Sequence, residues 1–459
     1  MLLSERFAAF INKSPISVMV RGTVERIFDP AVLNGVFENH TVLGYTKELT
    51  FSQCVQIMSA VVFNTTPSVG AYCKTHRDEI SVSRQSVYDK LKHLEPQVSA
   101  GLVHYSAKEL LPCIKKLKGQ APPLLPDYRV RVLDGNHLTG TEHRIFELRR
   151  FRSAALPGQC LAFYDPQFGL ITDVIPCEDA HAQERSLLVQ VLKCVVAGDC
   201  IVADRNFCTT GFLFGIRGQD AFFVIRQHAS TLSWKLQGKR RLAGKDGKGR
   251  NIYEQAVCLT DPKTGKTFTA RRITIALDRP TKDGDRELHI LTNLPEDAAD
   301  AVHIANLYAD RWTIETAFQQ LTDDLRCEIN TLGYPKAALF GFCTACVAYN
   351  AVVVVKAAIR MAHGKQYVEE ELSMYYLTLE VAEVTPGMMI AIPVAEWDVF
   401  RTMSSKEFVA TLAALATNLD KQKYTKSKRG PKRKQPKKLS GKRIHHVSTA
   451  RILAKRQQA

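Results

Sequence analysis

No apolar run in this sequence is long enough to cross a bilayer. The longest extends from Phe342 to Val355 and ends at Lys356, whereas a membrane-spanning helix needs about 20 apolar residues. The N-terminus carries Glu5 and Arg6 where a signal peptide has its apolar core. We therefore expect neither a membrane span nor secretion, and we predict that the apolar run is a buried helix.

A disulfide framework is also missing. The 12 cysteines are scattered along the chain, and Cys343 and Cys346 form the only close pair. A structural zinc site generally needs two such pairs, so we do not predict one. Free thiols are typical of the reducing cytoplasm, which is where we expect the protein.

Acidic residues are absent from the last part of the chain. Residues 421–459 contain 15 Lys or Arg, while the rest holds 47 basic and 46 acidic residues, so nearly all of the +16 charge lies in this segment. Such a segment cannot build a core, and Lys and Arg displace counterions from phosphates. We predict a disordered basic tail that contacts DNA or RNA through residues such as Lys432, Arg433 and Lys434. A merely solubilising tail is the alternative.

The pattern over residues 1–122 is typical of helices. Within it, residues 81–92 combine a serine cap with polar and basic positions, including Arg84. In a helix-turn-helix such a segment would enter the major groove of DNA, but an ordinary surface helix has the same composition. The proline-rich residues 121–126 then mark a domain boundary.

From Tyr128 onwards, short β-rich runs alternate with helical patterns. We predict strands at 129–135, 161–164, 170–175, 200–204 and 221–225, and helices at 182–196 and 210–217. This order of three strands, helix, strand, helix, strand predicts an α/β fold whose sheet has parallel members flanked by helices.

The regular alternation stops between residues 228 and 296. Gly, Lys and Arg crowd the start of this segment and strand-like runs follow, so we predict a β-rich insertion. A helix is expected from about Asp297 through Glu315, and residues 297–360 then complete the α/β region. Residues 361–420 are predicted to form a helical C-terminal region.

Two aspartates follow predicted strands directly. Asp134 and Asp204 each stand at a strand's carboxyl end, at the start of an expected turn. That edge of an α/β sheet is where active sites collect, although aspartate is also a common turn residue.

A third acidic residue lies on the helix expected to end this region. At 100° per residue, Tyr308, Arg311 and Glu315 share one narrow helix face beside an apolar face. A solvated helix face also carries Arg and Glu, so the pattern alone leaves both interpretations open. Trp312 points off the apolar stripe, where it would either stack on an unpaired base or be partly buried.

These residues resemble a known family. The blocks Leu133-Asp134-Gly135 and Ala203-Asp204-Arg205-Asn206-Phe207, with the signature Tyr-x-x-Arg-x-x-x-Glu met by Tyr308, Arg311 and Glu315, resemble the DDE transposases of bacterial insertion sequences, specifically insertion-sequence family four. The 111-residue separation between Asp204 and Glu315 also matches. The resemblance covers about residues 128 to 350.

The resemblance implies an RNase H-like core formed by residues 128–227 and 297–360. The β-rich insertion, residues 228–296, interrupts this core. Residues 1–122 would then be the DNA-binding domain, preceding the core, and residues 421–459 the basic tail that follows it.

The resemblance also implies the chemistry. Asp134, Asp204 and Glu315 would be the catalytic residues and would hold two Mg²⁺ ions, with Mn²⁺ as an alternative, to cleave transposon ends and transfer strands. Arg311 and Tyr308 would contact phosphate. The expected partners are double-stranded transposon ends and target DNA, with a homodimer in the synaptic complex, in the cytoplasm at the nucleoid.

One position departs from the family signature, which has Lys seven residues after its Glu. Here that position is Thr322, which cannot place a positive charge near a phosphate. Arg326, expected one turn further on the same face, is a candidate substitute that would bind DNA. Two alternatives therefore stay open: an RNase H-like nuclease without strand transfer, and a catalytically impaired DNA-binding remnant of a transposase.

Overall fold

The computed structural model describes residues 3–42, 48–142, 144–149, 155–228, 232–281, 284–427 and 430. The chain divides into two compact units, Met1–Thr425 and Lys426–Ala459. All elements described below lie in the first unit. The predicted DNA contacts at Lys432, Arg433 and Lys434 lie outside the described residues.

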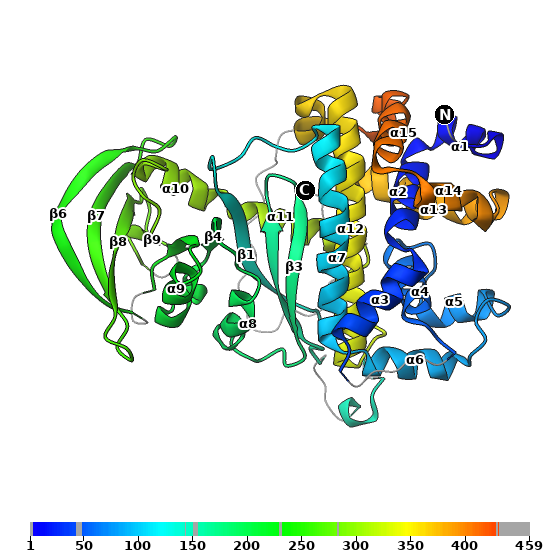
Figure 1. Ribbon diagram of the computed structural model, residues 1–459, viewed down its shortest axis with the longest axis horizontal. Helices are drawn as coiled ribbons and strands as arrows, with labels where there is room; N and C mark the ends of the chain where they lie inside the picture. Colours follow the sequence, from blue (N-terminus) through cyan, green and yellow to red (C-terminus); the bar gives the residue numbers. More distant parts are fainter. Residues whose placement is uncertain are drawn as a thin grey trace, which may run out of the picture. The chain divides into compact units, whose positions relative to one another are not determined.

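Within the described residues, one nine-stranded sheet runs through the first unit in the order β3-β2-β1-β4-β5-β9-β8-β7-β6 (Figure 1). Its strands are β1 (Arg129–His137), β2 (Gln159–Asp165), β3 (Leu170–Cys177), β4 (Asp199–Ala203), β5 (Phe222–Arg226), β6 (Ser233–Lys245), β7 (Asn251–Thr260), β8 (Thr267–Ala276) and β9 (Glu287–Thr292). The pairs β1–β4 and β4–β5 are parallel, and all other neighbours are antiparallel. The predicted α/β sheet with parallel members is therefore present.

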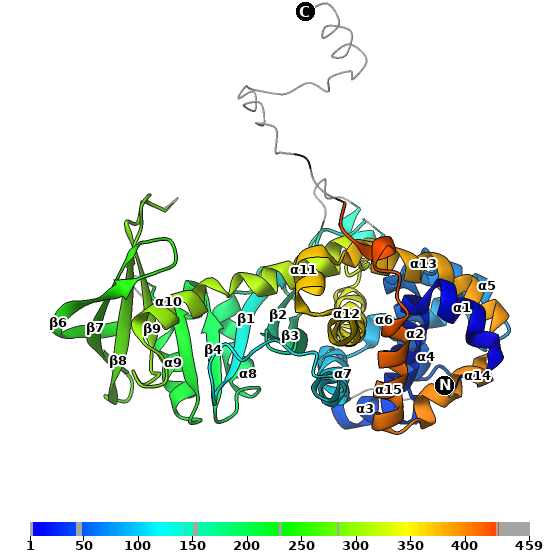
Figure 2. The same ribbon diagram turned by 90° about the horizontal axis from the view of Figure 1, so that it is seen from above.

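Buried residues alternate between the two faces of this sheet, as strand geometry requires. Ile201 and Ala203 of β4 pack in one cluster with α8 (Leu188–Leu192) and α9 (Thr210–Arg217). Val202 packs in the other cluster, which includes α10 (Ala301–Ala309). Figure 2 shows α10 on one side of the sheet, and α8 and α9 on the other.

The predicted insertion does not form a separate body. Its strands β6 to β9 extend the same sheet, because β9 pairs with β5 through three residues, Val224 to Arg226. β6 closes that edge, and its side chains are largely exposed. The insertion therefore lengthens the core sheet sideways.

Two long helices cover the β3 end of the sheet. α12 (Pro335–His363) and α7 (Pro96–Leu117) lie side by side and both pack against β3 (Figure 1). The amide of Asn350 fixes this packing, since it exchanges two hydrogen bonds of 2.9 Å with the backbone of Ile171. By length and composition α12 could cross a membrane, as could the bent pair α13–α14 taken together, but the apolar window of α12 is wholly buried inside the protein. The predicted buried helix is confirmed.

The remaining helices form one body from both ends of the chain. They are α1 (Ala8–Lys13), α2 (Pro15–Ile27), α3 (Pro30–His40), α4 (Phe51–Val62), α5 (Val69–Thr75), α6 (Arg84–His93), α13 (Met374–Ala391), α14 (Val394–Thr402) and α15 (Ser405–Thr417). α2 packs against α13, α14 and α15. Gly22 of α2 lies so close to Phe400 that a Cβ would stand 2.4 Å from the ring. The regions predicted separately as 1–122 and 361–420 are thus packed together.

The single helix predicted through Glu315 is wrong. α10 ends at Ala309, and α11 (Trp312–Asp323) begins three residues later. Between them the backbone bonds tighten to three-residue spacing, for example from Arg311 N–H to the Tyr308 carbonyl at 3.2 Å. The hydrogen-bond ladder of the helix is therefore interrupted between Ala309 and Trp312.

The tail starts later than predicted. Lys421–Tyr424 form a 3₁₀ turn, and the Tyr424 side chain is buried. Its hydroxyl donates to buried Glu380, and Lys423 Nζ lies 2.6 Å from the same carboxylate. These contacts anchor the chain up to Thr425, which pairs with Leu372.

Candidate active site

One register pair places the two aspartates together. Leu133 of β1 is the last residue paired with β4, and its partner is Ala203. Asp134 and Asp204 are the next residues on these parallel strands, so they leave the sheet edge at the same level. Asp204 precedes the predicted turn, whereas Asp134 does not open one: β1 continues to His137, paired with β2 alone.

The segment around the α10–α11 break reaches both aspartates. Tyr308 donates a hydrogen bond from its hydroxyl to Asp204 Oδ1 at 3.3 Å. Arg311 Nη1 lies 2.6 Å from Asp134 Oδ2, and Nη2 lies 3.2 Å from Glu315 Oε1. Tyr308 and Arg311 are both only 8% exposed. The five residues predicted from the strand ends and the helix face therefore lie in one connected cluster.

Burial and charge act in opposite directions on Asp134. Burial raises the pKa of its carboxyl to about 6, while the Arg311 guanidinium and the Gly135 N–H group lower it and the carboxylates of Glu184 and Glu315 raise it further. Burial likewise raises the pKa of the Tyr308 hydroxyl, followed by the effect of Asp204. Tyr308 is therefore a hydrogen-bond donor at neutral pH, and Asp134 carries its charge only at a cost.

The carboxylate oxygens of this cluster are chemically suitable ligands for a divalent cation. Carboxylate oxygens are the hard ligands that Mg²⁺ prefers, and a cation beside Asp134 would relieve the repulsion from its acidic neighbours. In the present arrangement Arg311 stands between Asp134 and Glu315. Accordingly, no three His, Cys, Asp or Glu side chains in the described part of the chain are grouped closely enough to hold a metal. Asp134 and Asp204 follow paired residues of adjacent strands, whereas Glu315 is linked to Asp134 through the Arg311 guanidinium.

We expect Asp134→Asn to stabilise the protein at pH 7.5 in the absence of divalent cations. The pKa of Asp134 in the folded state is about 6, raised from 3.8. Ionised Asp134 therefore lowers the free energy of unfolding. This loss of stability grows between about pH 4 and pH 6 and is constant above pH 6. The gain is on the order of 1–3 kcal/mol. Urea denaturation at pH 5 and pH 7.5 measures it, and the gain must be larger at pH 7.5. Equal stability of the two proteins at pH 7.5 would contradict the burial of a charged Asp134.

The other residues predicted on this helix differ in their surroundings. Trp312 is 62% exposed, and the Arg311 guanidinium carbon lies 5.4 Å from its ring centroid. It is therefore available for stacking, and the alternative of partial burial is wrong. Thr322 is exposed in the last turn of α11, with its hydroxyl donating to the Phe318 carbonyl.

The prediction that Arg326 shares the helix face of Glu315 is wrong. α11 ends at Asp323, and Arg326 N–H bonds the Val62 carbonyl at 3.0 Å. Its guanidinium donates to the Pro67 carbonyl at 3.1 Å. The chain after α11 is therefore not helical at Arg326, and Arg326 is hydrogen-bonded to the N-terminal region through both its backbone and its side chain.

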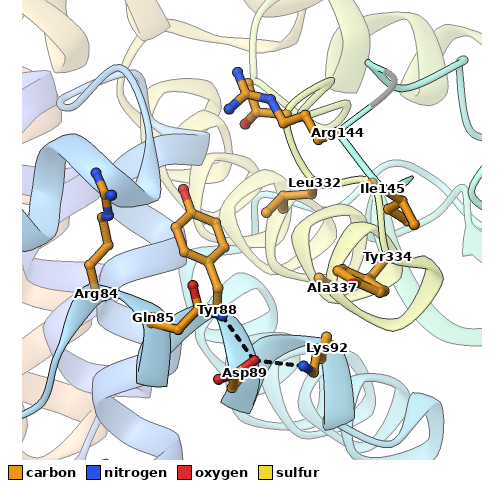
Figure 3. Close-up of a pocket in the computed structure, with 12 residues that line it drawn as sticks. Arg84, Gln85, Tyr88, Asp89, Lys92, Arg144, Ile145, Leu332, Tyr334 and Ala337 are labelled. Carbon is orange, nitrogen blue, oxygen red and sulfur yellow. Dashed lines mark hydrogen bonds and ion pairs between the residues drawn. The ribbon is translucent and has the colours of Figure 1, made fainter. Parts of the chain in front are cut away.

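Arg84 lies at the first position of α6, whose N-cap Ser83 accepts a hydrogen bond from Ser86 N–H. The Arg84 side chain borders a cleft of about 350 Å³ between α6 and residues 331–334 (Figure 3). Lys92 and Arg144 also line this cleft, as do Tyr88 and Tyr334. Cations and aromatic rings together are typical of nucleic-acid contacts.

One acidic residue near the cluster, Glu184, is not predicted from the sequence. The helix predicted over 182–196 is instead a 3₁₀ turn, Glu184–Leu187, followed by the short α8. Glu184 accepts a hydrogen bond from Asn206 Nδ2 at 3.3 Å. Its negative charge raises the pKa of the Asp134 carboxyl. No periodicity or motif singles it out, because its place depends on how the turn folds against β1.

Comparison with known proteins identifies the region that carries this cluster. A family model described as a transposase DDE domain matches residues 125–351. A putative transposase, y4zB, of Sinorhizobium fredii is 29% identical over 134 residues, which are 29% of this chain and 35% of the relative. The transposase for insertion sequence element IS421 of Escherichia coli is 26% identical over 210 residues, covering 38% of this chain and 54% of the relative.

These alignments are partial: the chain spans between about a third and about half of the length of these relatives. A solved structure, a piggyBac transposase synaptic complex with hairpin DNA, covers 83% of both chains at 11% identity, but its TM-score of 0.37 does not establish a common fold. The family match includes Asp134, Asp204, Tyr308, Arg311 and Glu315. Residues 125–351 are therefore similar to a transposase DDE domain, and the relatives that the chain matches are named as transposases, among them those of insertion sequences.

Proposed function

We propose that this chain is a DNA transposase that cleaves the ends of its element and transfers them to target DNA. The observation that carries the proposal is the register pair Leu133–Ala203, which sets Asp134 and Asp204 side by side within reach of the Tyr308–Glu315 segment. Asp134, Asp204 and Glu315 are the proposed catalytic residues and metal ligands. Two Mg²⁺ ions, or Mn²⁺, would activate water and neutralise charge on the phosphate when bound.

The strand order supports a finer assignment of the fold. Three antiparallel strands, β3-β2-β1, continue into the parallel strands β4 and β5, with helices on both faces. We assign this part to an RNase H-like core of insertion-sequence family four. The cluster at the shared edge of β1 and β4 lies where α/β sheets place their active sites.

We propose separate roles for Tyr308, Arg311 and Trp312. Tyr308 holds one oxygen of Asp204, and Arg311 holds one oxygen of Asp134. The Arg311 guanidinium, which pairs with Asp134 and Glu315, has the planar geometry to donate two parallel hydrogen bonds to a phosphate. Exposed Trp312, next to it, would stack on an unpaired base.

We propose double-stranded DNA, at the element ends and at the target, as the partner. Arg84 and the cleft that it borders would contact the backbone of an element end, and the basic tail would add sequence-independent contacts. The protein would act in the cytoplasm at the nucleoid, as a homodimer that holds both ends in a synaptic complex.

Two observations favour a second candidate, a DNA-binding protein whose site has lost activity. Thr322 stands in place of the signature Lys, and Arg311 occupies the space between Asp134 and Glu315. A nuclease that cuts without joining is the third candidate.

Strand transfer by the purified chain separates these candidates. The substrates are labelled element-end DNA, a target plasmid and 5 to 10 mM Mg²⁺, amounts on the order that the weak binding of Mg²⁺ to carboxylates requires. A transposase yields joined products, a nuclease yields nicked ends alone, and a remnant binds ends without cutting them. The same DNA with a scrambled terminus is the control.

Removing residues 428–459 should weaken DNA binding and flatten its salt dependence. This segment holds 12 Lys or Arg and no acidic residue, and each lost phosphate contact lowers the slope of log K against log salt by about 0.9 for duplex DNA. The cut falls after Thr425, so the anchor at Glu380 stays intact. Fluorescence anisotropy between 50 and 200 mM salt, roughly the range in which such contacts dominate, measures both quantities. An unchanged slope would show that the tail does not touch DNA.

A further inference from the structure

A run of basic residues lies on β6 and on the turn that joins it to β7. Residues 233–250 contain seven Lys or Arg and a single acidic residue, Asp246. β6 is the edge strand at the end of the sheet far from helices α1 to α6 (Figure 1), and its side chains are largely exposed. The run therefore presents positive charge along an open edge of the sheet.

The acidic side chains near this run are already paired with arginines. The ion pairs are Arg240–Glu287, Arg241–Glu254, Arg241–Glu296 and Arg250–Asp246, with N···O distances between 2.6 and 2.9 Å. The lysines differ: among the described residues, no acidic side chain pairs with exposed Lys239, Lys245 or Lys248. The positive charge that remains without a counter-charge is therefore that of the lysines.

The β6–β7 turn holds its lysine on an ordered backbone. The Asp246 N–H group donates to the Arg250 carbonyl at 3.0 Å. The Asp246 carboxylate accepts hydrogen bonds from the N–H groups of Lys248 and Arg250, both at 2.9 Å. Binding a ligand at an ordered turn costs less conformational entropy than binding it at a loop that must first be ordered.

The strand register places β6 level with the aspartates. Four antiparallel pairings lead from β5 through β9, β8 and β7 to β6, so β6 runs in the same direction as β4. Ala203 of β4 pairs with Ile225 of β5. The next row across the sheet runs through Arg226, Ile290, Ile273, Glu254 and Arg241. Asp204 begins this row, and Lys245 lies beyond its far end, at the same edge of the sheet as the candidate active site.

The length of this row can be expressed in base pairs. Five strand spacings of roughly 4.8 Å separate β4 from β6, which makes about 24 Å along the sheet. The base pairs of duplex DNA are about 3.4 Å apart. A duplex that lies along this edge with its cleaved bond at Asp134 and Asp204 therefore passes β6 within about seven base pairs of the cut.

Lysines on an edge strand have a simpler explanation, because charged side chains there prevent pairing with strands of other copies. Acidic residues would serve that purpose equally well, and a few charges of either sign would suffice. A run of seven basic residues with one acidic residue is instead complementary to a polyanion. Lysine ammonium groups release counterions from phosphates without reading the base sequence.

We propose that β6 and the β6–β7 turn bind the phosphate backbone of the DNA that flanks the element, beyond the cleaved bond. This inference rests on the proposed function, which puts the cut at Asp134 and Asp204 and the element end at the cleft beside α6. α6 and β6 lie at opposite ends of the sheet (Figure 1), so the DNA at β6 is on the other side of the cut. Contacts that ignore base sequence suit flanking DNA, which differs at every insertion site.

Two duplexes with the same element end test the inference. One stops at the cleaved bond, and the other continues into flanking DNA for about 15 base pairs, roughly twice the span to β6. Fluorescence anisotropy with the full chain and no divalent cation measures Kd for each duplex. The wild type should bind the flanked duplex roughly tenfold more tightly or better, because additional phosphate contacts release additional counterions.

Lys245→Gln/Lys248→Gln removes two charges and keeps most of the length of both side chains. This variant should lose most of the preference for the flanked duplex, and its slope of log K against log salt on that duplex should fall by about 1.8. The matched control, Lys263→Gln/Lys266→Gln, removes two exposed charges from the turn between β7 and β8, at the opposite end of these strands. It should bind both duplexes as the wild type does.

The outcomes separate this inference from the proposed function. If the wild type binds both duplexes alike, or if Lys245→Gln/Lys248→Gln keeps the preference, the lysines only protect the strand edge and the inference is overturned. Equal losses on both duplexes would put the contacts on the element and overturn it as well. If the wild type neither prefers an element end to a scrambled terminus nor cleaves it, the proposed function fails and the inference falls with it. A preference lost in this variant and kept in the control supports the flanking-DNA surface.

Discussion

Asp134→Asn is expected to abolish cleavage of element ends while sparing their binding. The change removes a charged oxygen ligand but keeps the shape of the side chain, and its amide oxygen can still accept from Arg311 Nη1, now 2.6 Å from Asp134 Oδ2. Metal-assisted stabilisation of a phosphate transition state is worth several kcal/mol. The cleavage rate should therefore fall roughly 10³-fold or more.

The measurement is single-turnover cleavage of a labelled end in Mg²⁺, beside a gel-shift assay without metal. Asp310→Asn is the matched control, because Asp310 is exposed, carries the same charge and directly precedes Arg311. It should cleave like the wild type. Full activity in Asp134→Asn would show that the metal ligand lies elsewhere, whereas loss of end binding as well would point to a folding defect.

Strands β1 to β5 could be predicted because their signal is local. Apolar runs bounded by turns gave β1 to β5 nearly in place and Asp204 directly after β4, whereas Asp134 lies within β1, one residue beyond its last pair with β4. That both fall at one level of the sheet depends on the parallel register Leu133–Ala203. Pairing between strands 70 residues apart leaves no local trace, so the register was not predictable.

Tyr308, Arg311 and Glu315 lie near one another although the continuous helix predicted for them is interrupted. Tyr308, Arg311 and Glu315 were grouped by assuming continuous 100° steps, yet the helix breaks at Asp310 and Arg311. Both residues at the break keep right-handed helical backbone angles, so the rotation is roughly preserved. The group therefore stays on one side although the hydrogen-bond ladder is interrupted.

Long-range contacts explain the failures. Arg326 was extrapolated along α11, but its backbone bond to Val62 and its side-chain bond to Pro67 take it out of the helix. Charge alone predicts that the disordered tail begins at Lys421, although Tyr424 is buried and its hydroxyl donates to Glu380. Glu184 stands against Gly135 through tertiary packing. Composition and periodicity carry no information about such partners.

Thr322 is the position where one substitution should increase activity. It is exposed in the last turn of α11, and about 700° of rotation, or −20°, separates it from Glu315 on an ideal helix. A lysine there would present an ammonium group on the side of the helix that carries Arg311 and Glu315, where the family signature has one. A charge-assisted hydrogen bond to phosphate is worth on the order of 1.5–3 kcal/mol. We expect Thr322→Lys to raise end binding or cleavage roughly 10- to 150-fold.

The matched control is Thr316→Lys. Thr316 is also exposed on α11 and likewise donates its hydroxyl to the carbonyl four residues before it, but it lies 120° from Thr322 around the helix. A gain in both variants would indicate unspecific attraction of DNA, and a gain in neither would mean that position 322 does not touch an end.

Arg326 lies beyond the end of α11, and its guanidinium donates to the Pro67 carbonyl, so we expect that it does not compensate for Thr322. Arg326→Ala should therefore leave single-turnover cleavage unchanged and lower stability instead, because it removes a bond between the N-terminal helices and the chain after α11. If the wild type is inactive and Thr322→Lys cleaves, the chain is an impaired copy whose cation site is intact. If both cleave and the lysine variant is faster, the chain is a working transposase that binds its ends weakly. Since the two results differ only in the wild-type rate, the same assay with both proteins decides between them.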